Sequence, residues 1–316
     1  MTAACREPVA AAPARRGSPF DLADDGAYRR WRDAKLQGQP RRVEDLIVDV
    51  RDPRSLSPSE RTEILQRIAS ANLAIYRSPV VDADKSLPRR LGHQLGLHRL
   101  DGNWLADEDG VSQITVRGAP RGAGDGGAAY IPYTDRAIKW HTDGYYHPQE
   151  RQIHGMILHC VRAAREGGIN ALMDHERAYI ALRDADPRWV RALMAADAMT
   201  IPARMGEGGV ARPAQSGPVF SIDSGSGALH MRYTARTRSI EWKRDACTHD
   251  AVASLQALLD SDQLYRFELG LRPGMGVVGH NVLHERSAFV DDPLQPRLLY
   301  RARYRDRIPA SAAALR

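Results

Sequence analysis

The chain has 316 residues, and its 45 Lys and Arg against 39 Asp and Glu give a formal net charge of +6. This length allows a full hydrophobic core and lies near the upper limit of one elaborated domain. Cys5, Cys160 and Cys247 are too few and too widely separated for a disulfide framework, which favours a reducing, cytoplasmic setting. No apolar run approaches the roughly 20 residues of a membrane span.

The excess of basic residues does not by itself indicate a nucleic-acid-binding protein. The arginines are scattered along the chain, and neither zinc-finger spacing nor an aromatic-rich RNA-binding strand is visible. A small anionic ligand is compatible with the charge. Arg204, Arg212 and Arg232 mildly favour an acidic or zwitterionic substrate, although ordinary surface arginines explain them about as well.

The N-terminal part predicts a tail followed by a helix and a strand. Residues 1–19 are rich in Ala, Pro and Arg without periodicity, which is typical of a disordered tail. Residues 57–60, SPSE, form a capping-box pattern with proline at the first helical position. They predict a helix over 58–71, and residues 72–77 predict a short strand.

The middle of the chain predicts strands separated by a glycine-rich loop. Residues 113–116 alternate as a strand does, whereas 118–127 contain too many glycines to order cheaply. That segment is expected to be a mobile loop, with closure over a site as one role. Residues 152–161 are apolar on both faces and predict a strand buried on both sides, with Cys160 in the core.

The remaining pattern completes the expected fold. Helices are expected from the Asp174 cap through Leu182, after Pro187, and from Thr248 or Asp250 onward. Strands are expected over 267–271, 276–284 and 297–305. Short strands with helices at the start and in an insertion indicate an α+β fold with a mainly β core, a jelly roll. We therefore expect one domain over 20–316, with a helical and loop insertion around 174–247.

The stretch WHTDGYYH, residues 140–147, holds the first candidate metal ligands. His141 and Asp143 are two residues apart, so their side chains point the same way on an extended segment. An imidazole nitrogen and a carboxylate oxygen could then bind one ion. His-x-Asp is a weak pattern alone. For the aromatic residues of this loop, packing is as good an explanation as substrate contact.

A third ligand has to come from elsewhere in the chain. His147 would need the turn after Gly144 to fold back, and the pair His280 and His284, if both lay on one strand, would face one side. His284 stands out because a turn and a strand carrying Arg297 and Arg301 follow it. Two histidines and one carboxylate leave coordination positions open, as in non-haem Fe(II) oxygenases, and an arginine can grip a carboxylate in a bidentate way.

Four blocks now show a resemblance to a known family. WHTDG at 140–144, EGGINALMDHERAYIAL at 166–182, LRPGMGVVGHNVLHERSAF at 271–289 and RLLYR at 297–301 occur in the order found there. The chain resembles the TauD/TfdA-type Fe(II)- and 2-oxoglutarate-dependent dioxygenases, relatives of taurine dioxygenase and clavaminate synthase. The likeness runs from about Tyr133 to Arg303.

This resemblance implies a fold and a set of roles. The fold would be a double-stranded β-helix, the cupin-like jelly roll. His141, Asp143 and His284 would bind iron, and Arg301 would hold the distal carboxylate of 2-oxoglutarate. Arg297 would be a supporting charge, and Asn170 stands where relatives carry a threonine, a change that Arg286 or Arg297 could compensate. Apart from the resemblance, Tyr145, Tyr146 and Arg286 are candidate substrate contacts.

The resemblance also implies a reaction. Related halogenases lack the carboxylate ligand, so Asp143 favours hydroxylation, desaturation or oxidative cleavage of a small substrate, with succinate and carbon dioxide formed from 2-oxoglutarate. His280 stands where relatives often carry an acidic or polar residue, and the sequence offers no account of it. Neither the primary substrate nor the oligomeric state, monomer or homo-oligomer, follows from the sequence.

Three other interpretations remain open at this point. A jelly-roll enzyme could use the same ligands with Zn, Mn or Ni for hydrolysis or isomerisation. A non-catalytic jelly roll could bind a ligand and use HTD only as a loop. Oxidative demethylation of nucleic acid needs the same cofactors, but the arginine motif expected there lacks its Asn and Thr spacing, so neither nucleic acid nor a membrane is an expected partner.

Overall fold

The computed structural model describes residues 17–102, 109–116, 131–206, 209–236, 240–261 and 265–309. The glycine-rich loop expected at 118–127 lies outside these ranges, as do residues 1–16 of the expected tail. Over the described ranges, no helix combines the length and the apolar character that a membrane crossing requires.

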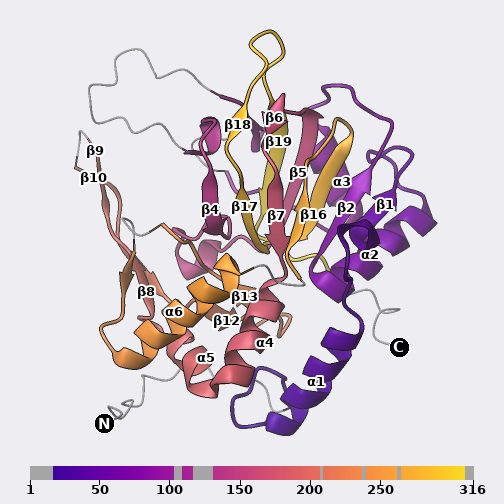
Figure 1. Cartoon of the computed structure of the whole chain (residues 1–316). Coiled ribbons are helices and arrows are strands. Elements are labelled where there is room, and N and C mark those ends of the chain that lie inside the picture. The colour runs from indigo at the N-terminus through magenta and orange to yellow at the C-terminus, as the bar shows by residue number, and fades with distance from the viewer. Residues whose placement is uncertain are drawn as a thin grey trace. The chain divides into compact units, whose positions relative to one another are not determined.

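The chain has a mixed α/β fold with a sheet-rich core, and it divides into two compact units. The larger unit is made of residues 40–139, 153–173 and 266–316, and the smaller one of residues 1–39, 140–152 and 174–265. The larger unit contains the main sheets, whereas most helices lie in the smaller one (Figure 1). The single domain with an insertion stays a prediction.

The larger unit contains the helix that the capping pattern predicted. Helix α2 (Pro58–Ala71) starts after Ser57, whose side chain accepts a hydrogen bond from the Glu60 amide while the Glu60 carboxylate accepts one from the Ser57 amide. It ends at Asn72, whose φ of 62° lies in the left-handed region. Strand β2 (Leu73–Arg77) follows at once, so both predicted elements are confirmed.

A six-stranded sheet forms the centre of this unit, with strand order β1-β2-β16-β5-β19-β3. Only β1 and β2 pair in parallel, and the other neighbours are antiparallel. The remaining bounds are β1 (Ile47–Asp49), β3 (Val111–Ile114), β5 (Gly155–Arg162), β16 (Met275–His280) and β19 (Leu298–Tyr304). The buried strand expected at 152–161 is confirmed as β5, and β3 begins two residues before the strand expected at 113–116.

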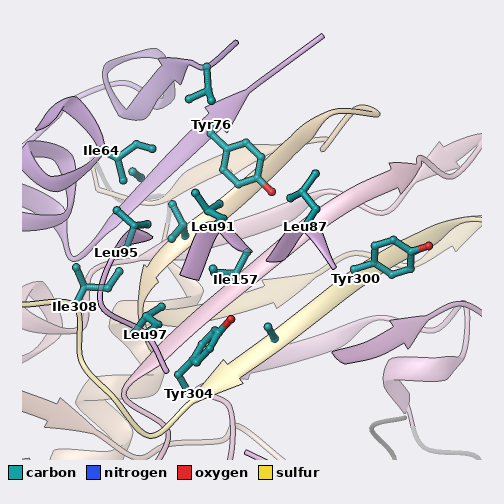
Figure 2. Close-up of a cluster of buried hydrophobic side chains, with 14 of the residues drawn as sticks. Ile64, Tyr76, Leu87, Leu91, Leu95, Leu97, Ile157, Tyr300, Tyr304 and Ile308 are labelled. Atoms are coloured by element: carbon teal, nitrogen blue, oxygen red, sulfur yellow. The ribbon is translucent and has the colours of Figure 1, made fainter. Parts of the chain in front are cut away.

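Helices α2 and α3 (Leu87–Gln94) cover one face of this sheet. Figure 2 shows Ile64 and Leu91 from these helices beside Tyr76, Ile157 and Tyr304 from the strands, and all five belong to one buried cluster. Burial of large apolar side chains at about 25 cal/mol per Å² is the main favourable term in such a layer. This face of the sheet is therefore covered by a hydrophobic core.

The other face packs against a four-stranded sheet with strand order β15-β7-β17-β4. A second buried cluster joins Cys160, Val277 and Leu299 of the six-stranded sheet to Leu172 and Phe267 of the four-stranded sheet. Cys160 is thus a core residue, as predicted, and burial raises the pKa of its thiol to about 11. The bounds are β4 (Ile138–His141), β7 (Asn170–Met173), β15 (Phe267–Leu269) and β17 (Leu283–Arg286).

One prediction about this region is wrong. Residues 276–284 do not form one strand: β16 ends at His280, and β17 begins at Leu283 in the other sheet. The buried side chain of Asn281 fixes the crossing by donating to the Ile153 carbonyl at 2.9 Å. His280 and His284 therefore do not share a strand face.

The smaller unit packs its helices around an aromatic cluster. The rings of Phe20 and Trp31 meet edge to face at 5.0 Å, and Phe20 and Phe220 both lie 5.5 Å from Tyr179. The helices are α1 (Asp25–Gln37), α4 (His175–Ala185), α5 (Pro187–Leu193) and α6 (Ala246–Asp260). The expected helices after Asp174 and at Pro187 are confirmed, whereas α6 starts before Thr248, because Asp245 is the cap.

Short strands complete the smaller unit. Strands β11-β8-β14 form one sheet, and β10-β9 and β12-β13 form two hairpin-like pairs. Their bounds are β8 (Met199–Ile201), β9 (Arg204–Gly206), β10 (Gly209–Arg212), β11 (Gln215–Gly217), β12 (Phe220–Ile222), β13 (Leu229–Met231) and β14 (Glu241–Trp242). In the larger unit, β6 (Glu166–Gly167) pairs with β18 (Phe289–Val290).

Candidate metal centre

The loop that carries His141 and Asp143 is held to the segment after β13. The Thr142 amide donates to the Tyr233 carbonyl at 2.9 Å, and the Thr142 hydroxyl accepts from the Tyr233 amide at 3.0 Å. The Ala235 amide donates to the Trp140 carbonyl at 2.8 Å. These bonds keep residues 140–142 extended, which is the condition for His141 and Asp143 to point the same way.

A turn follows the two candidate ligands directly. Gly144 has a φ of 67°, which a residue with a side chain rarely adopts, and its carbonyl accepts from the His147 amide at 2.8 Å. Asp143 is only 6% exposed, so water competes little for its carboxylate. The glycine of WHTDG is thus needed for the backbone conformation of the turn, whereas the histidine and the aspartate are the candidate metal ligands.

His284 lies on β17, where it pairs with Leu172 of β7. Its Nδ1 lies 2.9 Å from the Val282 carbonyl oxygen. A carbonyl only accepts, so Nδ1 carries the proton and Nε2 keeps its lone pair. A metal-binding histidine usually donates its other ring N–H to a carbonyl or carboxylate in this way. The bond fixes the tautomer and the orientation of the ring.

The three predicted ligands come together. One ligand atom from each of His141, Asp143 and His284 lies within 4.8 Å of the others, a spacing that could hold a metal ion. Two imidazoles and one carboxylate suit a divalent iron and leave further coordination positions open. The donor set and the tautomer of His284 therefore both fit an iron site.

Other histidines have structural partners. His280 Nδ1 lies 2.6 Å from the Asn72 side-chain oxygen, and its Nε2 lies 3.2 Å from the Ile308 carbonyl oxygen. His280 thus ties the end of α2 to the C-terminal segment, a role that sequence reasoning missed. His159 is fully buried beside the Tyr76 hydroxyl, and burial lowers its pKa to about 4, so it is neutral.

Arg297 borders a cavity of about 340 Å³ in the larger unit. Its guanidinium is buried, lies 5.1 Å from the Phe289 ring centroid, and has its pKa lowered by burial. The cavity is within the range of about 300–1,000 Å³ typical of small-molecule sites. Its lining includes Gly167, Gly168, Ile169, Leu271 and Leu299 but not Arg301.

Arg286 of β17 and Asn170 of β7 are register partners, and the bonds of both side chains go to backbone carbonyls. Arg286 donates to the Thr134 carbonyl at 2.9 Å and to the Arg136 carbonyl, and burial lowers its pKa to about 10. These bonds fix the segment that enters β4. The buried Asn170 amide donates to the Gly168 carbonyl at 3.4 Å. Ligand contacts for both residues stay predictions.

Tyr145 and Tyr146 are half-buried, with ring centroids 5.3 Å apart. The Tyr145 carbonyl accepts from the Nε of Arg232 at 2.7 Å. Arg232 also donates to the Met199 carbonyl at 3.1 Å and the Gln215 carbonyl at 2.7 Å, so it joins the ligand loop to β8 and β11. The sequence carries no signal for this role because the three acceptors are distant and belong to the backbone.

Two curated proteins are similar to the chain. A uridine-5'-phosphate dioxygenase from Amycolatopsis is 34% identical over 188 residues, covering 54% of this chain and 62% of that protein, less than two thirds of its length. A uridine-5'-phosphate dioxygenase from Streptomyces is 31% identical over 205 residues, covering 62% of this chain and 69% of that protein.

A solved structure shares the fold. Asparagine oxygenase, in complex with Fe(II), hydroxyasparagine and succinate, superposes with a TM-score of 0.53 at 16% identity, covering 79% of this chain and 80% of that one. The family model described as "Taurine catabolism dioxygenase TauD, TfdA family" matches residues 33–303, most of the chain. The family expected from the four sequence blocks is confirmed: the chain belongs to the TauD, TfdA dioxygenase family.

Proposed function

We propose that this protein is an Fe(II)- and 2-oxoglutarate-dependent dioxygenase built on a double-stranded β-helix. The observation that carries the proposal is the grouping of His141, Asp143 and His284 within 4.8 Å, with His284 in the tautomer that leaves Nε2 for a metal. The two facing sheets, with a shared apolar core, support the β-helix.

When bound, iron and 2-oxoglutarate supply an oxidant for substrate C–H bonds, with succinate and carbon dioxide as co-products. The chain has to hold the metal, orient 2-oxoglutarate and exclude water. His141, Asp143 and His284 do the first. A buried arginine that lines the cavity, Arg297, is suited to the second, because a guanidinium in low dielectric binds a carboxylate strongly. Arg301, four residues on along β19, is the alternative anchor.

We further propose that the primary substrate is a small acidic molecule, with a nucleoside 5'-monophosphate as the first candidate. Two observations support this choice. The similar curated proteins are uridine-5'-phosphate dioxygenases. The ligand loop is tied to Arg232, whose pKa is lowered to about 10 mainly by burial and further by repulsion from Arg212, so these two positive charges lie near each other.

The test is metal content together with succinate formation from 2-oxoglutarate in the presence of uridine 5'-phosphate. We expect one iron per chain and a weak visible charge-transfer band under anaerobic conditions. Asp143→Ala should reduce succinate formation by at least about a hundredfold, because its carboxylate is one of the three ligands. The control is His93→Ala on α3, an exposed histidine outside the ligand set. Full succinate formation by Asp143→Ala would rule out the assignment.

A further inference from the structure

The β9–β10 hairpin places two arginines side by side. Arg204 and Arg212 are cross-strand partners beyond a register shift between Val210 and Arg212, and partners directly opposite each other present their side chains on the same face. Like charges placed directly opposite each other destabilise a two-stranded ribbon. The hairpin face therefore concentrates two positive charges, which makes it a suitable surface for an anionic ligand.

Arg212 is fixed before any ligand arrives. It is half-buried, and it donates to the Pro202 carbonyl at 2.7 Å and to the Pro213 carbonyl at 3.3 Å. These bonds use two of the five N–H donors of a guanidinium, so donors remain for a ligand. Burial, together with repulsion from Arg204, lowers the pKa of Arg212.

The arginine pair belongs to the same unit as the loop that carries His141 and Asp143. Arg212 lies near enough to Tyr145 and Tyr146 for its charge to interact with both rings' hydroxyl groups. Tyr145 follows Asp143 by two residues, and its carbonyl is held by Arg232. The cationic face therefore adjoins the segment where substrate has to meet the metal ligands.

We propose that Arg204 and Arg212 bind the phosphate of a nucleoside 5'-monophosphate substrate. This inference rests on the proposed function and names the group that selects the substrate. A phosphate carries up to two negative charges and several acceptor oxygens, which match two guanidinium forks better than a single carboxylate does. Arg232 is a positioning residue here, because all its hydrogen bonds within the smaller unit go to backbone carbonyls.

The test compares binding of uridine 5'-phosphate and of uridine by titration calorimetry, with the protein loaded with Mn(II) and 2-oxoglutarate. Arg212→Ala should weaken the nucleotide at least about tenfold and leave the nucleoside unchanged. Arg212→Lys should weaken nucleotide binding less, because the positive charge remains while the guanidinium fork is lost. Arg191→Ala, an exposed arginine of α5 in the same unit, is the matched control and should bind both ligands as the wild type does.

The outcomes separate this inference from the proposed function. Equal weakening of nucleotide and nucleoside, or unchanged nucleotide binding in Arg212→Ala, would overturn the phosphate site, even if succinate forms. Failure of the wild type to prefer the nucleotide over the nucleoside would overturn it as well. If Arg212→Ala loses the nucleotide selectively but no succinate forms with the wild type, the phosphate site stands and the dioxygenase proposal fails.

Discussion

Strand β19 and the β9–β10 hairpin each carry two arginines, but the surroundings of these arginines differ between the two regions. Arg303 of β19 is 4% exposed and pairs with Asp101, whose side chain is fully buried, at 2.6 Å. Arg204 of the hairpin is exposed and faces another arginine. In sequence both regions read as basic segments. The comparison teaches that the surroundings of each arginine, which the sequence does not give, decide whether its charge is buried in an ion pair or exposed on the surface.

The largest effect should come from breaking the ion pair in β19. Arg303→Met leaves the Asp101 carboxylate buried without its partner, which typically costs about 3–5 kcal/mol of unfolding free energy. Urea denaturation measures this cost. The double variant Arg303→Met with Asp101→Leu removes both charges and should recover most of it. A single variant as stable as the wild type would show that water reaches this pair.

The cation of Lys35 has a third kind of surrounding, because one ammonium group forms ion pairs with two carboxylates. Its Nζ lies 2.7 Å from Asp174 and 2.5 Å from Glu176, and all three side chains are nearly buried. We expect Lys35→Met to lose about 3 kcal/mol, because two carboxylates then remain buried close together. Arg32→Met, which removes a partly exposed pair on the same helix, is the control and should change stability little.

The ion pair of Lys35 and Asp174 also affects how the protein unfolds in acid. Burial by itself raises the pKa of Asp174, but the opposing effects, of which attraction to Lys35 is the largest, together hold the pKa below the ordinary value. A depressed carboxylate pKa gives stability that is complete above the unfolded value, about 4, and is lost as the pH falls through the folded value. In Lys35→Met burial acts without that attraction, so acid unfolding should begin at higher pH. Circular dichroism against pH measures the shift.

Local signals predicted much of the fold. The Ser57 and Glu60 pattern predicted the start of α2, because a capping box depends only on neighbouring residues. The crossing from β16 to β17 was missed, because the apolar alternation continues through it. What fixes the crossing is a hydrogen bond from Asn281 to Ile153, a residue 128 positions away. Non-local contacts of this kind leave no periodic signal.

In the candidate site, too, some residues could be predicted from local sequence and others could not. The spacing of His141 and Asp143 indicated a candidate pair of ligands, because residues two apart on an extended segment share a face, but the pattern was weak until the family resemblance supported it. His284 needed the family resemblance in addition. Arg232 had been singled out only as a charge, and its backbone acceptors at Tyr145, Met199 and Gln215 could be known only from the fold.

Within β19 and its approach, Arg297 and Arg301 can be separated by their effect on 2-oxoglutarate. Arg297 lines the cavity and Arg301 does not, so Arg297→Ala should raise the KM for 2-oxoglutarate by about ten- to a hundredfold, the loss expected for a charge-assisted bidentate contact. Arg301→Ala should have the smaller effect on this constant. A larger effect from Arg301→Ala would make Arg301 the anchor, as the family resemblance first implied.

The smallest effect on stability should be the most informative about the hairpin, because it should have the opposite sign. Arg204→Glu places a carboxylate across from Arg212 and replaces repulsion by attraction, so the melting temperature should rise by at most about 3 °C. The same change puts negative charge where a phosphate is proposed to bind, so affinity for uridine 5'-phosphate should fall while affinity for uridine does not. Added salt should reduce the gain in melting temperature, since exposed charges are screened. A variant that is both more stable and unchanged in nucleotide affinity would mean that the paired arginines serve the hairpin and not a ligand.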